Sequence, residues 1–205
     1  MTNNIPTKEK ILEVAIDLFS KEGYNGVSIR EITREVGIKE SSLYNHFKNK
    51  EEILTTIFEL FQYEFSKTLP SIEMLDQILT QSSLEDFFNQ GFKNFKVHID
   101  NPINEKLWRI LYMEHFRQSF VRDIFLYDII QKTLDFLELV FEKLISQGKV
   151  KPLKPALLAA EYQYPIFSML TEYNILRFDR KETSEIENKM KEHIAFFLNT
   201  VKVED

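Results

Sequence analysis

Apolar residues recur at helical spacing along most of this chain, and this pattern constrains the fold more than any other feature. Near the N-terminus, Ile11, Val14, Ala15, Leu18 and Phe19 follow the i, i+3, i+4, i+7, i+8 pattern of an amphipathic helix. Only five glycines and six prolines interrupt the 205 residues, and we find no run with the alternation that marks a strand. The sequence therefore predicts an all-α protein.

Capping signals and glycines predict where several helices begin and end. Ser28 and Glu31 form a capping box, in which each side chain can bind the backbone amide of the other. The helix that starts there is expected to end at Gly37, and Asn49 is placed to cap the next long helix. Further helices are expected near residues 83–99, 103–117, 119–147, 155–177 and 184–202, with a shorter one within 71–80.

The stretch GIKESSLYNHFKNKEEIL, residues 37–54, contains a helix of barely two turns that carries few apolar residues. Such a helix is marginal in water by itself, so we expect Ile38, Leu43 and Phe47 to pin it onto its neighbours. A helix, a turn through Gly37 and a second short helix make a helix-turn-helix, whose second helix enters the major groove of DNA. The expected DNA-binding residues are Ser28, Arg30, Lys39, Ser41, Ser42, Tyr44, His46 and Lys50.

These residues are expected to divide between base edges and phosphates. Lys39, Ser41 and Ser42 lie at the start of the short helix, nearest the bases, whereas Tyr44, His46 and Lys50 are placed to reach phosphates. Arg30 is a further candidate for a phosphate contact, although it could instead pair with a neighbouring glutamate.

The charge distribution permits DNA binding by the N-terminal region. The formal net charge is −6, yet residues 1–50 hold eight Lys or Arg against seven Asp or Glu. Phosphate binding depends on a local cationic face and not on the total charge of the chain.

Residues 7–54 resemble the DNA-binding head of the TetR family of bacterial transcriptional repressors. The resemblance rests on Ile11, Ala15, Leu18, Phe19, Gly23, Tyr24, Ser28, Ile29, Ile32, Val36, Gly37, Ile38, Leu43, Tyr44, His46, Phe47 and Lys50. It implies a homodimer whose C-terminal helices form an effector pocket and a dimer bundle. Glu40 departs from the family, where a lysine is common; its carboxylate could accept from a cytosine amino group, but we expect it to point away from DNA.

The remainder of the chain is expected to be a helical ligand-binding and dimerisation bundle. We place the boundary between residues 1–50, a three-helix helix-turn-helix head, and residues 51–205. Aromatic and polar side chains at helical spacing are candidates to line a pocket for a small hydrophobic effector: Phe88, Phe92, Phe95, Trp108, Tyr112, His115 and Glu161. The candidate dimer-interface residues are Phe167, Leu170, Ile194, Phe197 and Val201.

The sequence thus predicts a ligand-responsive regulator, most simply a repressor, that binds a double-stranded DNA operator. An architectural DNA-binding protein without an effector remains an alternative. An all-α enzyme is disfavoured, because we find no nucleophile–base pair, metal cluster or phosphate loop, and the absence of cysteine excludes thiolate sites. We expect no cofactor, no metal and no membrane span, and a cytoplasmic location.

Overall fold

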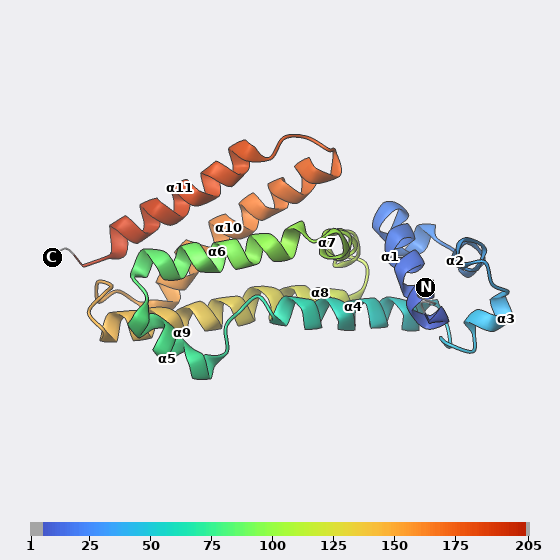
Figure 1. Ribbon diagram of the computed structural model, residues 1–205, viewed down its shortest axis with the longest axis horizontal. Helices are drawn as coiled ribbons and strands as arrows, with labels where there is room; N and C mark the ends of the chain where they lie inside the picture. Colours follow the sequence, from blue (N-terminus) through green and yellow to red (C-terminus); the bar gives the residue numbers. More distant parts are fainter. Residues whose placement is uncertain (1–5, 204–205) are drawn as a thin grey trace, which may run out of the picture. The chain divides into compact units, whose positions relative to one another are not determined.

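The computed structural model describes residues 6–203, and the regular structure in this range is helical apart from one isolated bridge between Val150 and Lys202. Figure 1 shows the helices in chain order. Their bounds are α1 Thr7–Gly26, α2 Ile29–Val36, α3 Glu40–Leu43, α4 Lys50–Ser66, α5 Ile72–Gln81, α6 Leu84–Asp100, α7 Pro102–Glu114, α8 Ser119–Asp123, the π-helix η1 Ile124–Gln131, α9 Lys132–Ser146, α10 Pro155–Phe178 and α11 Ser184–Val201. The expected all-α class is confirmed.

The chain divides into two compact units whose bounds differ from the expected boundary at residue 50. The first unit contains the described residues up to Ser66 together with His98–Leu126, and the second contains Lys67–Val97 and the chain from Tyr127 onward. The first unit extends past residue 50 because α7 packs against both α1 and α4. The helix-turn-helix therefore shares its compact unit with α4, α7 and α8.

The core of the first unit is aromatic. Trp108 of α7 is 1% exposed and meets the rings of Phe61 and Phe65 of α4 edge-on, with ring centroids 5.2 and 5.9 Å apart. Beside this core, Lys106 of α7 donates to Asp17 of α1 over 2.8 Å. The Lys106 ammonium, and then that of Lys21, holds the pKa of Asp17 below its ordinary value. The contacts made by α7 thus hold α1 in place.

The segment 119–147 is not the single helix that we expected. It consists of α8, the π-helical η1 and α9. The i→i+5 bonds of a π-helix wind more residues into each turn, so the register of a 3.6-residue stripe breaks there. Leu126 lies three residues before Ile129 and is 44% exposed, whereas Ile129 and Val140 are buried.

The second unit is built around α9, α10 and α11, with α5 packed on α9. Four aromatic rings form its centre. The centroid of the Phe88 ring lies 4.9 Å from that of Tyr162 and 5.5 Å from that of Phe141, and the centroids of Phe197 and Tyr162 are 5.5 Å apart. Burial raises the pKa of the Tyr162 hydroxyl. His193 of α11 donates Nε2–H to the carbonyl oxygen of Tyr162 over 3.0 Å. These contacts join α11 to α10 within one chain.

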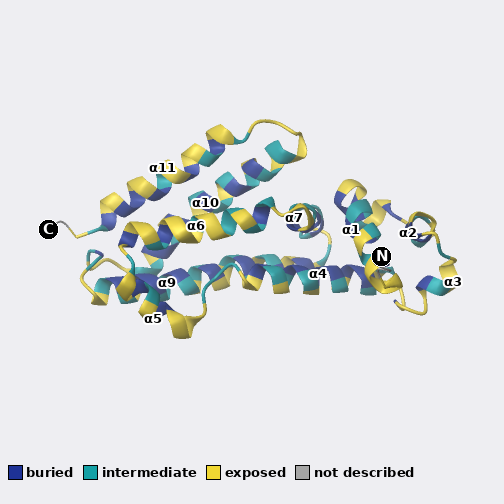
Figure 2. Ribbon diagram, viewed as in Figure 1, coloured by how far each residue is buried: buried dark blue, intermediate teal, exposed yellow. Residues whose placement is uncertain are grey.

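Most of the residues expected at a dimer interface are instead buried inside the single chain. Leu170, Ile194 and Val201 are at most 3% exposed and Phe197 is 8% exposed, while Phe167 is half-buried. Figure 2 shows the buried positions recurring along α11 between exposed ones. The apolar stripe of α11 is therefore used within the chain, and four of the five expected interface residues have no surface to offer a second copy.

Candidate nucleic-acid interface

The start of α2 is fixed by the capping box that the sequence indicated. Ser28 Oγ accepts from the amide of Glu31 over 3.2 Å, and the amide of Ser28 donates to Glu31 Oε2 over 2.6 Å. The Ser28 hydroxyl also donates to the same carboxylate over 2.7 Å. Ser28 was expected to bind DNA, but its hydroxyl is already engaged in holding the helix terminus.

The turn between α2 and α3 depends on Gly37. Its φ of 79° and ψ of 34° are left-handed, which favours glycine, and its amide donates to the carbonyl of Thr33 over 3.0 Å. This left-handed residue ends α2 and turns the chain toward α3. The turn therefore sets the direction in which the short helix leaves α2.

α3 spans only four residues and is held by side chains on one face. Leu43 is fully buried and Phe47 is 1% exposed, while Ile38 is half-buried. The ammonium of Lys8 lies 5.2 Å from the centre of the Phe47 ring, so α1 also contacts this segment. With the apolar anchors turned inward, the exposed residues include Lys39, Ser41, Tyr44 and His46, and Ser42 is half-buried.

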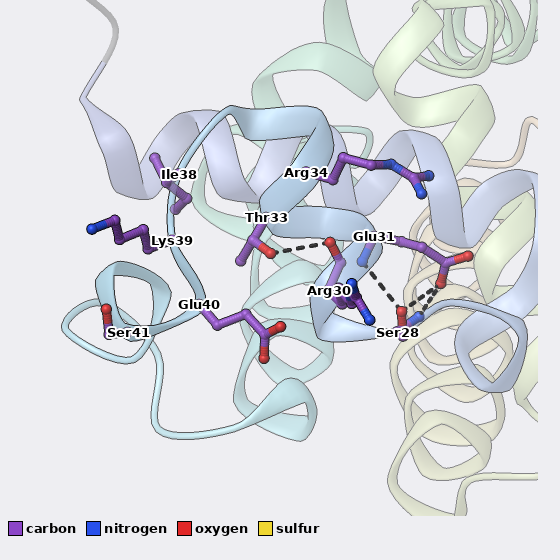
Figure 3. Close-up of a pocket in the computed structure, with 9 residues that line it drawn as sticks. All are labelled: Ser28, Arg30, Glu31, Thr33, Arg34, Ile38, Lys39, Glu40 and Ser41. Carbon is purple, nitrogen blue, oxygen red and sulfur yellow. Dashed lines mark hydrogen bonds between the residues drawn. The ribbon is translucent and has the colours of Figure 1, made fainter.

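A groove opens between α2 and α3 (Figure 3). It is lined by Ser28, Arg30, Glu31, Thr33, Arg34, Ile38, Lys39, Glu40 and Ser41. Some of the charged side chains already have a partner. Glu31 is held in the capping box, and Arg34 Nε lies 3.4 Å from Glu35 Oε1. Arg30, Lys39 and Glu40 make no ion pair with any residue in the described range. These three are available to a molecule that enters the groove.

Glu40 lines the groove, although we expected its side chain to point away from DNA. Figure 3 shows its side chain extending from α3 toward the wall formed by Ser28 and Arg30, while Lys39 extends in another direction. The groove therefore presents a guanidinium and a carboxylate together.

Lys50 lies against the connection between α1 and α2. Its ammonium donates to the carbonyl oxygen of Tyr24 and lies 4.1 Å from the centre of the Tyr24 ring and 5.7 Å from that of Phe19. Burial lowers the pKa of Lys50, and the charges of Glu114 and Glu31 oppose this effect. Lys50 was expected to meet phosphate, yet its ammonium here stabilises the head internally.

Glu114, at the end of α7, binds the same connection from the other side and is a residue that we did not predict. It is fully buried, and its Oε1 accepts from the amide of Tyr24 over 2.9 Å and lies 3.6 Å from Arg117 Nη1. Gly23 has a φ of 74°, and a Cβ added there would lie 3.2 Å from Glu114 Oε1. We call Tyr24, Lys50 and Glu114 the clasp. Because Tyr24 and Glu114 are 90 residues apart in sequence, no local pattern could have revealed it.

The candidate effector residues fall into both compact units. Trp108, Tyr112 and His115 belong to the first unit, whereas Phe88, Phe92, Phe95 and Glu161 belong to the second. Trp108 and Phe88 are buried among other rings, which places both in packed cores. Glu161 is exposed.

The part of the chain that the structure describes holds neither a metal-ligand cluster nor a membrane-spanning helix. Within residues 6–203, no group of three or more His, Cys, Asp or Glu side chains is arranged to hold a metal ion. None of the helices in that range combines the length and the apolar character needed to cross a membrane.

The arrangement of α1–α4 defines a helix-turn-helix DNA-binding protein, and comparison with known proteins narrows this class. Residues 11–57 match the family model described as bacterial regulatory proteins, tetR family. The helix-turn-helix region of this chain is therefore that of a TetR-family transcriptional regulator.

Two bacterial regulators illustrate how far the sequence similarity extends. IcaR of Staphylococcus epidermidis, the negative transcriptional regulator of the biofilm operon icaADBC, is 52% identical over 46 residues, which cover 22% of this chain and 25% of IcaR. YttP of Bacillus subtilis, a probable HTH-type transcriptional regulator, is 26% identical over 145 residues, covering 71% of this chain and 66% of YttP. The chain thus matches less than two thirds of the length of either relative.

Solved structures extend the likeness of fold to the whole chain. A TetR family transcriptional regulator from Pseudomonas syringae pv. tomato superposes with a TM-score of 0.69 at 14% identity, covering 100% of both chains. AibR, in complex with isovaleryl coenzyme A and operator DNA, superposes with a TM-score of 0.58 at 22% identity, covering 80% of this chain and 83% of AibR. At these identities the likeness shows the fold.

Proposed function

We propose that the protein is a transcriptional repressor that binds an operator through the groove between α2 and α3. The observation that carries this proposal is the set of exposed groups on that surface: Arg30, Lys39, Tyr44 and His46 project outward while Leu43 and Phe47 hold α3 from behind. Guanidinium and ammonium groups bind phosphates and guanine edges, and exposed hydroxyls bind phosphates. Repression, and not activation, is supported by the similarity of this region to IcaR, a negative regulator.

The operator is expected to consist of two half-sites because we propose that the protein acts as a homodimer. The proposed dimer surface is the exposed face of α10 and α11, which replaces the buried stripe. Its apolar members are each at least 53% exposed: Leu157, Tyr164, Ile175, Phe178 and Phe196. Exposed apolar patches of this kind mark protein–protein contacts, and a two-fold dimer places its two recognition helices about one helical turn of DNA, or a multiple, apart.

A small hydrophobic effector that releases the operator is the regulatory part of the proposal. It is supported by AibR, a protein of the same fold that holds both a coenzyme A thioester and operator DNA. An effector shifts the equilibrium only if it binds the released conformation more tightly than the DNA-bound one. An architectural DNA-binding protein would show weak sequence discrimination and no release by ligand.

The test is selection of duplexes from a random pool by the full-length protein, followed by affinity measurements across a salt series. We expect a two-fold symmetric site and a fall in affinity with salt. Lys39→Ala should weaken binding to the selected site by about 1–3 kcal/mol if Lys39 contacts a base, and should affect random duplexes little.

Lys21→Ala is the matched control, because Lys21 lies on α1 outside the groove and pairs with Asp17, so its loss should change neither affinity by more than about 0.5 kcal/mol. Failure of the unaltered protein to enrich any sequence would contradict the proposed function.

A further inference from the structure

We propose that Glu40 selects a cytosine in each operator half-site by accepting a hydrogen bond from its N4 amino group. This inference rests on the proposed function and adds a base preference to it. The residue stands out because a carboxylate is repelled by the phosphates that surround any DNA-binding surface, and a hydrogen bond from a base amino group would offset that repulsion.

The position of Glu40 is the first part of the argument. It is the first residue of α3, it is exposed, and its side chain extends into the groove toward Ser28 and Arg30 (Figure 3). α3 is the helix of a helix-turn-helix that enters the major groove with its N-terminal residues toward the base edges. Glu40 therefore lies where base contacts are made.

The second part of the argument is that no described residue binds the carboxylate of Glu40. The other glutamates near the groove are engaged: Glu31 binds Ser28, and Glu35 lies beside Arg34. Glu40 makes no ion pair with a described residue, although Arg30 lines the same groove. Its acceptor oxygens are thus free for a donor on the DNA.

The third part is the match to a base pair. In the major groove, guanine offers the acceptors N7 and O6, and its partner cytosine offers the N4 donor. Arg30 supplies donors and Glu40 supplies acceptors in one groove, which complements G·C pairs. A thymine would place its O4 acceptor against the carboxylate, and this repulsion adds discrimination.

The experiment uses full-length protein, with a selection from random duplexes for the unaltered chain, Glu40→Gln and Glu59→Gln. Glutamine keeps the size of the side chain while removing its charge. Glu59, exposed on α4 and outside the groove, is the matched control for loss of one negative charge from the same unit. Affinities are then measured on the selected site, on a site with the chosen C·G pair changed to T·A, and on a site with pyrimidin-2-one, which lacks the amino group, in place of cytosine.

For the unaltered protein and for Glu59→Gln we expect an enriched cytosine, and a loss of affinity on the order of 5- to 150-fold on either altered site. Glu40→Gln should lose this discrimination and shift its preference toward adenine, which glutamine binds through N6 and N7. Binding of Glu40→Gln to random duplexes should be equal to or tighter than that of the unaltered chain.

Two results would overturn the inference while leaving the proposed function intact. One is that Glu40→Gln enriches the same half-site with the same discrimination as the unaltered protein. The other is that Glu40→Gln tightens binding to every duplex by one common factor, which is the result expected if the carboxylate only repels DNA. If instead the unaltered protein enriches no sequence, the proposed function fails as well.

Discussion

The helix pairs α2–α3 and α10–α11 are both joined by a short connection, yet they are stabilised in different ways. α2 and α3 have 8 and 4 residues, and their anchors Leu43 and Phe47 are held by neighbouring elements of the first unit. α10 and α11 have 24 and 18 residues and are joined by their own core, which includes Tyr162, Ile194 and Phe197. The short pair depends on helices outside itself, whereas α10 and α11 pack on each other along a core that α9 also covers.

The two pairs also expose different chemistry. The outer surface of α2–α3 carries charged and hydroxyl groups, whereas α10–α11 leaves aromatic side chains such as Tyr164 and Phe196 in solvent. The first surface suits a polyanion and the second suits an apolar partner such as a second copy of the chain. The two pairs show that the residues buried on one face of a helix do not determine what the exposed face binds.

The largest expected effect separates the two faces of α11. Ile194→Ala should lower the free energy of unfolding by about 2–5 kcal/mol, because it leaves a cavity beside fully packed residues. Phe196→Ala, at a position 72% exposed, should leave the stability of the monomer within about 0.5 kcal/mol but weaken self-association. Urea unfolding and sedimentation at several protein concentrations measure both quantities. Equal losses of monomer stability would show that the assignment of the two faces is mistaken.

A smaller effect tests whether α2–α3 is supported from outside. Glu114→Ala should cost about 1–3 kcal/mol, because the part-buried amide of Tyr24 loses its acceptor, and operator affinity should fall with it. Glu114→Gln keeps a carbonyl oxygen for this amide and should cost less. Hydrogen exchange of the Tyr24 amide reports the change directly. If exchange there is as slow in Glu114→Ala as in the unaltered chain, α7 does not support the head.

The smallest effect is a dependence of stability on pH. The ion pairs with Lys106 and Lys21 lower the pKa of Asp17 from its ordinary value of 3.8, so this carboxylate stabilises the fold above about pH 4. The contribution is lost as the pH falls through the lowered pKa. Both partners in the Lys106 pair are more than a third exposed, so we expect about 0.5 kcal/mol. Asp17→Asn should unfold more easily than the unaltered chain at pH 7, and the two curves should converge near pH 2.

The helix-turn-helix could be predicted from the sequence because its signals are local. Ser28 and Glu31 are three residues apart, Gly37 marks the turn, and so few apolar residues remain in α3 that Leu43 and Phe47 must face inward. The direction of Glu40 could not be predicted, since it depends on the angle between α2 and α3.

The C-terminal helices show the limit of the same reasoning. A stripe at Ile194, Phe197 and Val201 predicts correctly that one face of α11 is buried, but it does not say whether the covering surface belongs to the same chain. Periodicity also assumes one helical pitch, and the π-helical η1 violates that assumption near Leu126. Long-range pairs such as Tyr24 and Glu114 leave no periodic signal at all.

The clasp has a consequence for building hybrid regulators. A chimaera that joins a foreign head to this chain at residue 50 would remove the Tyr24 and Gly23 that lie against Glu114. A donor head with any side chain at position 23 would push a methyl or larger group toward the carboxylate, in a backbone conformation that only glycine adopts readily. The transferable module is therefore discontinuous: it comprises α1–α4 together with α7, and a successful graft must exchange both segments at once.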